Sequence, residues 1–117
     1  MIDQKHTAAL TALLSDKGIV TEGSDVAAYQ TGARYDEGRA SIVLRPQTTE
    51  EVSAAVSYCV KNGIVLIPQS GNTGLVSGST PDMTGAQAVL SLDRMTKRFD
   101  LDLDNRSLRA DAGRVRL

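Results

Sequence analysis

Aromatic residues, cysteine and histidine are scarce in this chain of 117 residues. It has no tryptophan, one phenylalanine and three tyrosines, and it holds one cysteine and one histidine. So few aromatic side chains do not form the stacking platforms with which proteins bind single-stranded nucleic acids. A single cysteine allows no internal disulfide, and a single histidine does not make a metal site, so we expect no metal. No histidine stands near Cys59 to activate its thiol, so we interpret this residue as part of the core.

The chain also lacks an excess of charge and a long apolar run. Thirteen Lys and Arg residues stand against 14 Asp and Glu residues, and the net charge is −1. This balance does not provide the basic patch of a nucleic-acid-binding protein. No apolar run is long enough to span a bilayer, and the N-terminus lacks the basic start and apolar stretch of a secretory signal. Together with the absence of a disulfide, this predicts a cytoplasmic protein without a transmembrane segment.

Residues 1–40 are predicted to form an N-terminal helical segment. Apolar residues around Leu10 fall at helical spacing, and we expect Gly18 to end that helix. Ser24 is the expected N-cap of a second, short helix that runs through Tyr29, and a polar loop follows it.

A regular pattern of strands and helix begins at residue 41. Residues 41–44 predict a short buried strand that ends at Pro46. Thr48 and Glu51 have the spacing of a capping box for the helix that follows, and residues 64–67 predict a second strand. This order indicates a βαβ crossover with two parallel strands.

Three further strands are expected after a long loop. Residues 88–92 predict a buried strand, and residues 99–103 alternate apolar and acidic side chains, which predicts a strand with one wet face. Residues 107–112 are expected to pair back with it as an antiparallel strand. The alternating aspartates resemble the start of a calcium loop, but Asn105 stands where that loop needs glycine, so we expect no calcium there.

The stretch from Ile67 to Pro81 does not follow the packing pattern of its neighbours. Gly71, Gly74 and Gly78 alternate there with Ser, Thr and Asn side chains. Glycine lets backbone come close to a ligand, and successive N–H groups can bind a phosphate. An ordinary surface loop would use the same turn residues, but loops of this length without secondary structure are usually functional.

Two familiar nucleotide-binding loops do not fit this stretch. The P-loop needs a lysine after its last glycine, and Gly78 is followed by Ser79. The dinucleotide fingerprint needs two glycines separated by one residue, followed by a helix. The glycines at 71, 74 and 78 do not have this spacing, and no helical pattern follows them.

The runs SIVLRPQTTEEVSAAVSYCVKNGI, VLIPQSGNTGLVSGSTP and AVLSLDRMTKRFDLDLDNRSLRADAG resemble a known family. They look like the start of the FAD-linked oxidases of the vanillyl-alcohol oxidase type, with a PCMH-type FAD-binding domain. The similarity points in particular to D-2-hydroxy-acid dehydrogenases: D-lactate dehydrogenase, the glycolate oxidase flavin subunit and D-2-hydroxyglutarate dehydrogenase. It implies an α+β fold, with a βαβ unit followed by antiparallel strands. Residues 41–117 would be the first part of the FAD-binding domain, so we expect the chain to be an N-terminal piece of a longer protein.

The resemblance also implies where the cofactor binds. In this family the glycine-rich loop wraps the FAD pyrophosphate, and we expect backbone N–H groups and the hydroxyls of Thr73 and Ser79 to bind it. No histidine stands in this loop, so we predict non-covalent FAD. Ser70 and Ser77 stand where relatives usually carry glycine. The expected cofactor-binding residues are Gln69, Ser70, Gly71, Asn72, Thr73, Gly74, Leu75, Gly78 and Ser79, with Pro46 on the adenine side.

By the same resemblance, the whole protein oxidises a D-2-hydroxy acid by hydride transfer to the flavin and passes the electrons to an acceptor that the sequence does not identify. The family's catalytic residues lie in later segments, so we name none here and expect this chain alone to be inactive. A homodimer is compatible with the resemblance. Two alternatives stay open: a flavin oxidase or reductase of the same superfamily with another substrate, and a non-enzymatic module that binds FAD or phosphate.

Overall fold

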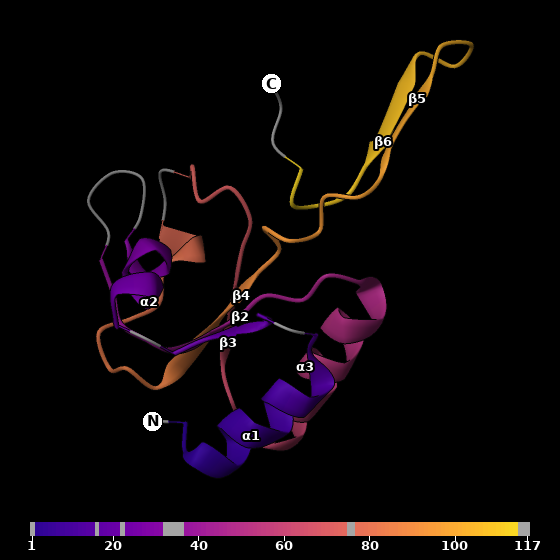
Figure 1. Cartoon of the computed structure of the whole chain (residues 1–117). Helices are drawn as coiled ribbons and strands as arrows, with labels where there is room; N and C mark the ends of the chain where they lie inside the picture. Colours follow the sequence, from indigo (N-terminus) through magenta and orange to yellow (C-terminus); the bar gives the residue numbers. More distant parts are fainter. Residues whose placement is uncertain (1, 16, 22, 32–36, 75–76, 115–117) are drawn as a thin grey trace.

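The computed structural model describes residues 2–15, 17–21, 23–31, 37–74 and 77–114. Helices and strands alternate along the first part of the chain, and a β-hairpin comes last (Figure 1). In chain order the elements are α1 (Gln4–Leu13), β1 (Ile19–Val20), α2 (Gly23–Gln30), β2 (Ala40–Leu44), α3 (Thr49–Lys61), β3 (Leu66–Gln69), the 3-10 turn η1 (Ser77–Ser79), β4 (Gln87–Ser91), β5 (Phe99–Asp102) and β6 (Ser107–Ala110).

Four strands form the central sheet in the order β1-β2-β4-β3. β1 is antiparallel to β2, while β4 is parallel to both β2 and β3. The predicted parallel relation of the two strands around α3 is therefore confirmed, but β4 lies between them. β3 also begins two residues later than predicted, at Leu66.

Helices cover both faces of this sheet, with α1 and α3 on one face and α2 on the other (Figure 1). Ile42 and Leu44 belong to the apolar cluster that contains Leu10 and Cys59, from α1 and α3. Val43, between them, belongs to the cluster on the α2 side. Successive residues of a strand point to opposite faces, so a short apolar run supplies both cores. The predicted place of Cys59 in the core is confirmed, because its side chain is fully buried.

The first two helices differ from prediction at their ends. α1 ends at Leu13, with Leu14 as its C-cap, so Gly18 is not its stop. Gly18 lies instead in the turn that leads to β1, where its N–H donates to the Ser15 carbonyl oxygen at 2.8 Å. α2 begins at Gly23, which puts Ser24 inside its first turn rather than at its N-cap.

The N-terminus of α3 is capped as predicted, although the capping box is incomplete. The Glu51 N–H donates to Thr48 Oγ1 at 3.1 Å. The Glu51 carboxylate does not return to the Thr48 N–H but accepts from the N–H groups of Ser15 at 2.6 Å and Gln47 at 2.9 Å. It therefore ties the segment after α1 to the start of α3.

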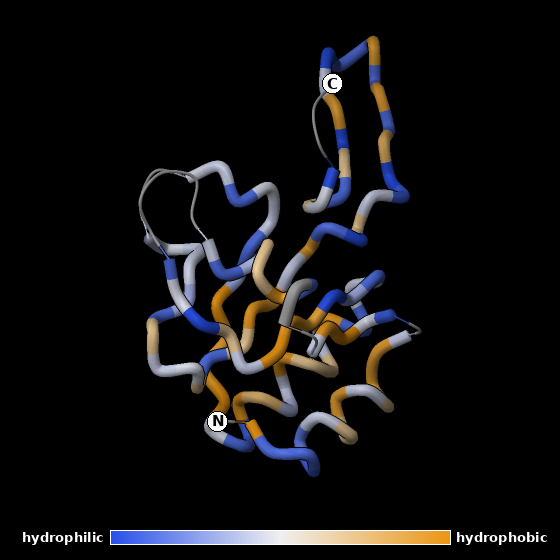
Figure 2. The backbone as a smooth tube through the Cα atoms, turned by 60° about the vertical axis from the view of Figure 1, so that its left-hand side comes forward, coloured by the Kyte–Doolittle hydropathy of each residue, from blue (hydrophilic) through white to orange (hydrophobic). Residues whose placement is uncertain are grey.

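The β5–β6 hairpin projects from the body of the protein (Figure 1). Apolar and polar residues alternate along both of its strands (Figure 2), and Phe99 and Leu101 lie opposite Ala110 and Leu108. The prediction of one wet face is wrong, because every residue of both strands is exposed. The apolar side is largely open to solvent, with Leu101 63% exposed, although the Arg114 guanidinium lies 5.0 Å from the centroid of the Phe99 ring.

None of the helices in the described ranges has the length and hydrophobicity needed to cross a membrane.

Candidate functional site

The glycine-rich loop leaves the sheet at its carboxyl edge, directly after β3. β3 and β4 are parallel neighbours, so residues 70–86 must carry the chain back to the opposite edge. Such crossovers usually contain a helix, but here the described residues form no more than the short turn η1. Ligands of open parallel sheets bind outside the carboxyl ends of the strands. The loop thus lies at the edge where a ligand is expected.

Backbone N–H groups in this loop are free to bind a ligand. Within the described part of the chain, no N–H from Ser70 to Gly74 donates a hydrogen bond. These residues, apart from half-buried Asn72, are exposed. A run of unpaired N–H groups at the surface suits an anion, because each group contributes a donor without a side chain in front of it.

The polypeptide itself does not require glycine at two positions of the loop. A Cβ at Gly71 would approach Thr73 Cγ2 at 3.9 Å, an ordinary contact, and a Cβ at Gly78 would meet no heavy atom of the described residues within 4 Å. Neither residue has a left-handed backbone. The open space beside both glycines leaves room for a ligand to reach the backbone, and this fits the expected pyrophosphate.

Asn72 shapes the loop instead of pointing into open solvent. It takes the left-handed conformation, with φ 54°, which Asn adopts more readily than most residues. Its Nδ2 donates to the Thr31 carbonyl oxygen at 2.7 Å, and its Oδ1 accepts from Ser79 Oγ at 3.0 Å. The hydroxyl hydrogen that Ser79 was expected to offer to phosphate is therefore used within the loop. The Thr73 hydroxyl makes no hydrogen bond among the described residues.

Gln69 and Ser70 hold the start of the loop from two sides. Gln69 is 4% exposed, and its Nε2 donates to the carbonyl oxygens of Tyr29 at 3.0 Å and Ser79 at 2.9 Å. Ser70 Oγ donates to the carbonyl oxygen of Ala112 at 2.6 Å, in the segment after β6. These bonds satisfy side chains and leave the N–H run free.

An ion pair stands beside Tyr29, one of the residues that hold the loop. Residues 69–80 hold no charged side chain. Arg45 Nε lies 3.0 Å from Asp93 Oδ1, and the Tyr29 hydroxyl donates to Asp93 Oδ2 at 2.6 Å. Burial, and then the bond to Asp93, raise the pKa of Tyr29 to about 12. In the described ranges no three His, Cys, Asp or Glu side chains gather to hold a metal ion.

Two predicted site residues are not among the exposed, described residues of the loop. Leu75 lies outside the described residues. Pro46 is fully buried just beyond β2, so its ring does not face solvent; its contact with adenine stays a prediction. Sequence reasoning missed the residues that hold the loop, Tyr29, Thr31 and Ala112. They lie 40 to 42 residues from their partners, and no local pattern marks them.

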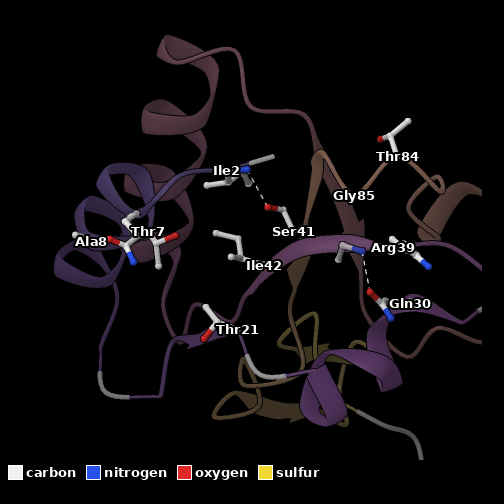
Figure 3. Close-up of a pocket in the computed structure, with 12 residues that line it drawn as sticks. Ile2, Thr7, Ala8, Thr21, Gln30, Arg39, Ser41, Ile42, Thr84 and Gly85 are labelled. Atoms are coloured by element: carbon white, nitrogen blue, oxygen red, sulfur yellow. Dashed lines mark hydrogen bonds between the residues drawn. The ribbon is translucent and has the colours of Figure 1, made fainter.

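A separate cavity of about 870 Å³ lies at the amino ends of the parallel strands (Figure 3). It is lined from α1, the end of α2 and the start of β2, and by no residue of 69–80. Two of its polar groups are already used: Ser41 Oγ accepts from the Ile2 N–H, and Gln30 Oε1 accepts from the Ala40 N–H, both at 3.0 Å. We place the candidate site in the loop, because parallel sheets bind ligands at the opposite edge.

Two known proteins are similar to this chain in sequence. A quinone-dependent D-lactate dehydrogenase of Haemophilus influenzae is 38% identical over 79 residues, covering 68% of this chain and 14% of that protein. A probable mitochondrial D-2-hydroxyglutarate dehydrogenase of Oryza sativa subsp. indica is 36% identical over 106 residues, covering 89% of this chain and 18% of that protein. The chain therefore spans less than a fifth of either relative.

A solved structure shows the same fold. Substrate-bound p-cresol methylhydroxylase superposes with a TM-score of 0.75 at 20% identity, over 97% of this chain and 23% of that one. The expected α+β fold of a PCMH-type FAD-binding domain is confirmed. Residues 40–115 match the protein family described as "FAD binding domain", and this range includes β2, α3, the loop and the hairpin. The chain belongs to this family of FAD-binding domains.

Proposed function

We propose that this chain is the FAD-binding part of an oxidoreductase that oxidises a D-2-hydroxy acid. The observation that carries the proposal is a run of backbone N–H groups from Ser70 to Gly74 that have no acceptor among the described residues and lie at the carboxyl edge of a parallel sheet. The substrate class comes from the two relatives, which are named for D-lactate and D-2-hydroxyglutarate.

Some side chains of the loop fix its shape, whereas its backbone would bind the cofactor. Asn72, Gln69 and Ser70 use their side chains to fix the loop. The backbone from Ser70 to Gly74, with the Thr73 hydroxyl, would then hold the FAD pyrophosphate. Neutral donors suffice for this, because several N–H dipoles aimed at one phosphate share its charge. FAD, when bound, supplies the acceptor for the hydride; the protein positions it.

The remaining features of the whole protein are proposals of the same kind. We propose that FAD is held non-covalently, that the groups that bind and deprotonate the substrate lie outside these residues, and that this chain alone is inactive. A cytoplasmic location and a homodimer also stay proposals. Some relatives are named as mitochondrial, so the cytoplasmic location needs a test of its own.

Titration with FAD tests the proposal directly. The chain should quench flavin fluorescence, and Gly71→Ala and Gly78→Ala should weaken binding by about tenfold or more, because a methyl group enters the space where the phosphate approaches. Both variants should keep the unfolding free energy of the wild type, since neither new Cβ meets a close neighbour. Absence of FAD binding by the folded whole protein would refute the proposal.

Chemistry and attachment are tested on the whole protein. Anaerobic addition of D-lactate or D-2-hydroxyglutarate should bleach the flavin spectrum, and the L-isomers should not. Acid denaturation should release all of the flavin, whereas flavin that remains on the polypeptide would contradict non-covalent binding. A spectrum that neither D-acid changes would remove the proposed substrate class while leaving FAD binding in place.

A further inference from the structure

The end of α2 supports the loop through its last carbonyl groups. Helix ends leave carbonyl oxygens without intrahelical partners. Here the Tyr29 carbonyl accepts from Gln69 Nε2 at 3.0 Å, and the Thr31 carbonyl accepts from Asn72 Nδ2 at 2.7 Å. The Gln30 carbonyl between them accepts from the Gly38 N–H at 2.9 Å. Hydrogen bonds to this helix end thus orient two side chains that shape the loop.

α2 has little packing of its own to fix that end. It is eight residues long, too short to be stable without tertiary contacts. Of its side chains that the structure describes, Val26 is buried, while Asp25, Ala27 and Ala28 are exposed. The position of its last turn therefore depends on specific bonds.

One such bond joins α2 to the sheet through the Tyr29 side chain. The ring packs beside Val26, Val43 and Val89, and its hydroxyl donates to Asp93 Oδ2 at 2.6 Å. Asp93 is in turn held by Arg45 Nε at 3.0 Å. Arg45 directly follows β2 and Asp93 closely follows β4, two paired parallel strands, so both charges stand on the rigid carboxyl edge of the sheet.

We propose that Tyr29 is a positioning residue for the cofactor loop: its hydroxyl, bound to the Asp93–Arg45 pair, fixes the end of α2 and thereby orients Gln69 and Asn72. This inference rests on the proposed function of the loop. Tyr29 acts through these two side chains and is not assigned a contact with FAD. A hydrogen bond to a carboxylate is stronger than one between neutral groups, which suits a single link that carries this role.

The first measurement uses NMR to monitor the exchange of the side-chain amide protons of Gln69 and Asn72 with solvent, in the chain without FAD. Tyr29→Phe keeps the ring and removes the hydroxyl, and it should speed this exchange. The matched control is Tyr58→Phe, which removes a hydroxyl bonded to His6 Nδ1 at 2.7 Å, between α1 and α3. The control should leave both amides as in the wild type.

The second measurement is FAD affinity. We expect about a tenfold loss for Tyr29→Phe, the order of one hydrogen bond to a charged group, and none for Tyr58→Phe. In an Asp93→Asn background, where Tyr29 has lost its charged acceptor, the further loss from Tyr29→Phe should be smaller.

The outcomes separate this inference from the function on which it rests. In a chain that binds FAD, unchanged amide exchange or unchanged FAD affinity in Tyr29→Phe would overturn the positioning role. If the whole protein binds no FAD, the proposed function fails, and the exchange of the two amides alone decides whether Tyr29 orients the loop. Equal effects of Tyr29→Phe and Tyr58→Phe would show a general loss of stability and would also overturn it.

Discussion

Individual glycines of this chain differ in whether the fold has room for a side chain at their positions. At Gly71 and Gly78 the described residues leave open space, and we propose that glycine there allows the cofactor to approach the backbone. At Gly113 a Cβ would lie 1.8 Å from the Leu92 carbonyl oxygen, so glycine there is required by the fold. The Gly113 N–H also donates to the Met95 carbonyl oxygen at 3.0 Å, which holds the base of the hairpin against the chain after β4.

Gly113→Ala should destabilise the protein. The new methyl group can be accommodated only if backbone moves, because the atoms it meets belong to the main chain. We expect a loss of about 1–3 kcal/mol in the free energy of unfolding, the range for overpacked sites. Urea denaturation measures it, with Gly78→Ala as the matched control. Equal stability of the two variants would show that the 111–114 segment does not pack as described.

At the scale of elements, hydrogen bonds to one carboxylate join the segment after α1 to the start of α3. Glu51, in the first turn of α3, accepts from the Ser15 and Gln47 N–H groups. Burial tends to raise the pKa of this carboxyl, but the bond from the Ser15 N–H and the one from Gln47 outweigh it and lower the pKa below its ordinary 4.5. A carboxyl with a lowered pKa in the folded state stabilises the protein when ionised.

This linkage predicts how Glu51→Gln depends on pH. The stabilisation by Glu51 should be fully present above its unfolded pKa and lost as pH falls through its lower folded pKa. Glu51→Gln should therefore unfold more easily than the wild type at pH 7, and the two should converge on acidification below 4.5. Thermal unfolding across this pH range checks it. Glu50→Gln is the control, since Glu50 is exposed and accepts no hydrogen bond within the described ranges. A wild-type advantage that persists in acid would contradict this role.

The whole molecule consists of a packed body and a projecting hairpin (Figure 1). Leu44 lies fully buried in the body, between the sheet and the pair α1 and α3. Leu101, in the hairpin, is 63% exposed. An isolated hairpin is marginally stable in water, so the stability of the chain depends on the body.

Two leucine substitutions should reveal this division. Leu44→Ala should cost about 2–5 kcal/mol of unfolding free energy, because it removes buried contacts and leaves a cavity. Leu101→Ala should cost less than about 1 kcal/mol, because little of its apolar surface is buried to begin with. Chemical denaturation of both variants measures the difference. Comparable losses would mean that the apolar side of the hairpin is covered in solution.

Predictions from the sequence succeeded where a local pattern carries the information. The spacing of apolar residues and the cap at Thr48 predicted α3, alternation predicted β5, and the expected antiparallel pairing of residues 107–112 predicted β6. Gly18 and Ser24 misled because a glycine or a serine near a helix end has several uses, and the neighbouring residues decide among them. The strand after α3 was predicted to begin two residues too early, because an apolar run alone does not show which of its residues pair with a neighbouring strand.

The sequence by itself determined the composition of the loop, the elements around it and the resemblance to an FAD-binding domain. Only the tertiary structure decided that β4 lies between β2 and β3, and that the loop is the crossover joining β3 to β4. It also decided that Tyr29 and Thr31 hold the loop and that the hairpin's apolar side is exposed. The physical reason is the distance along the sequence: periodicity and capping act over a few residues, whereas strand order and these contacts join residues that lie tens of positions apart.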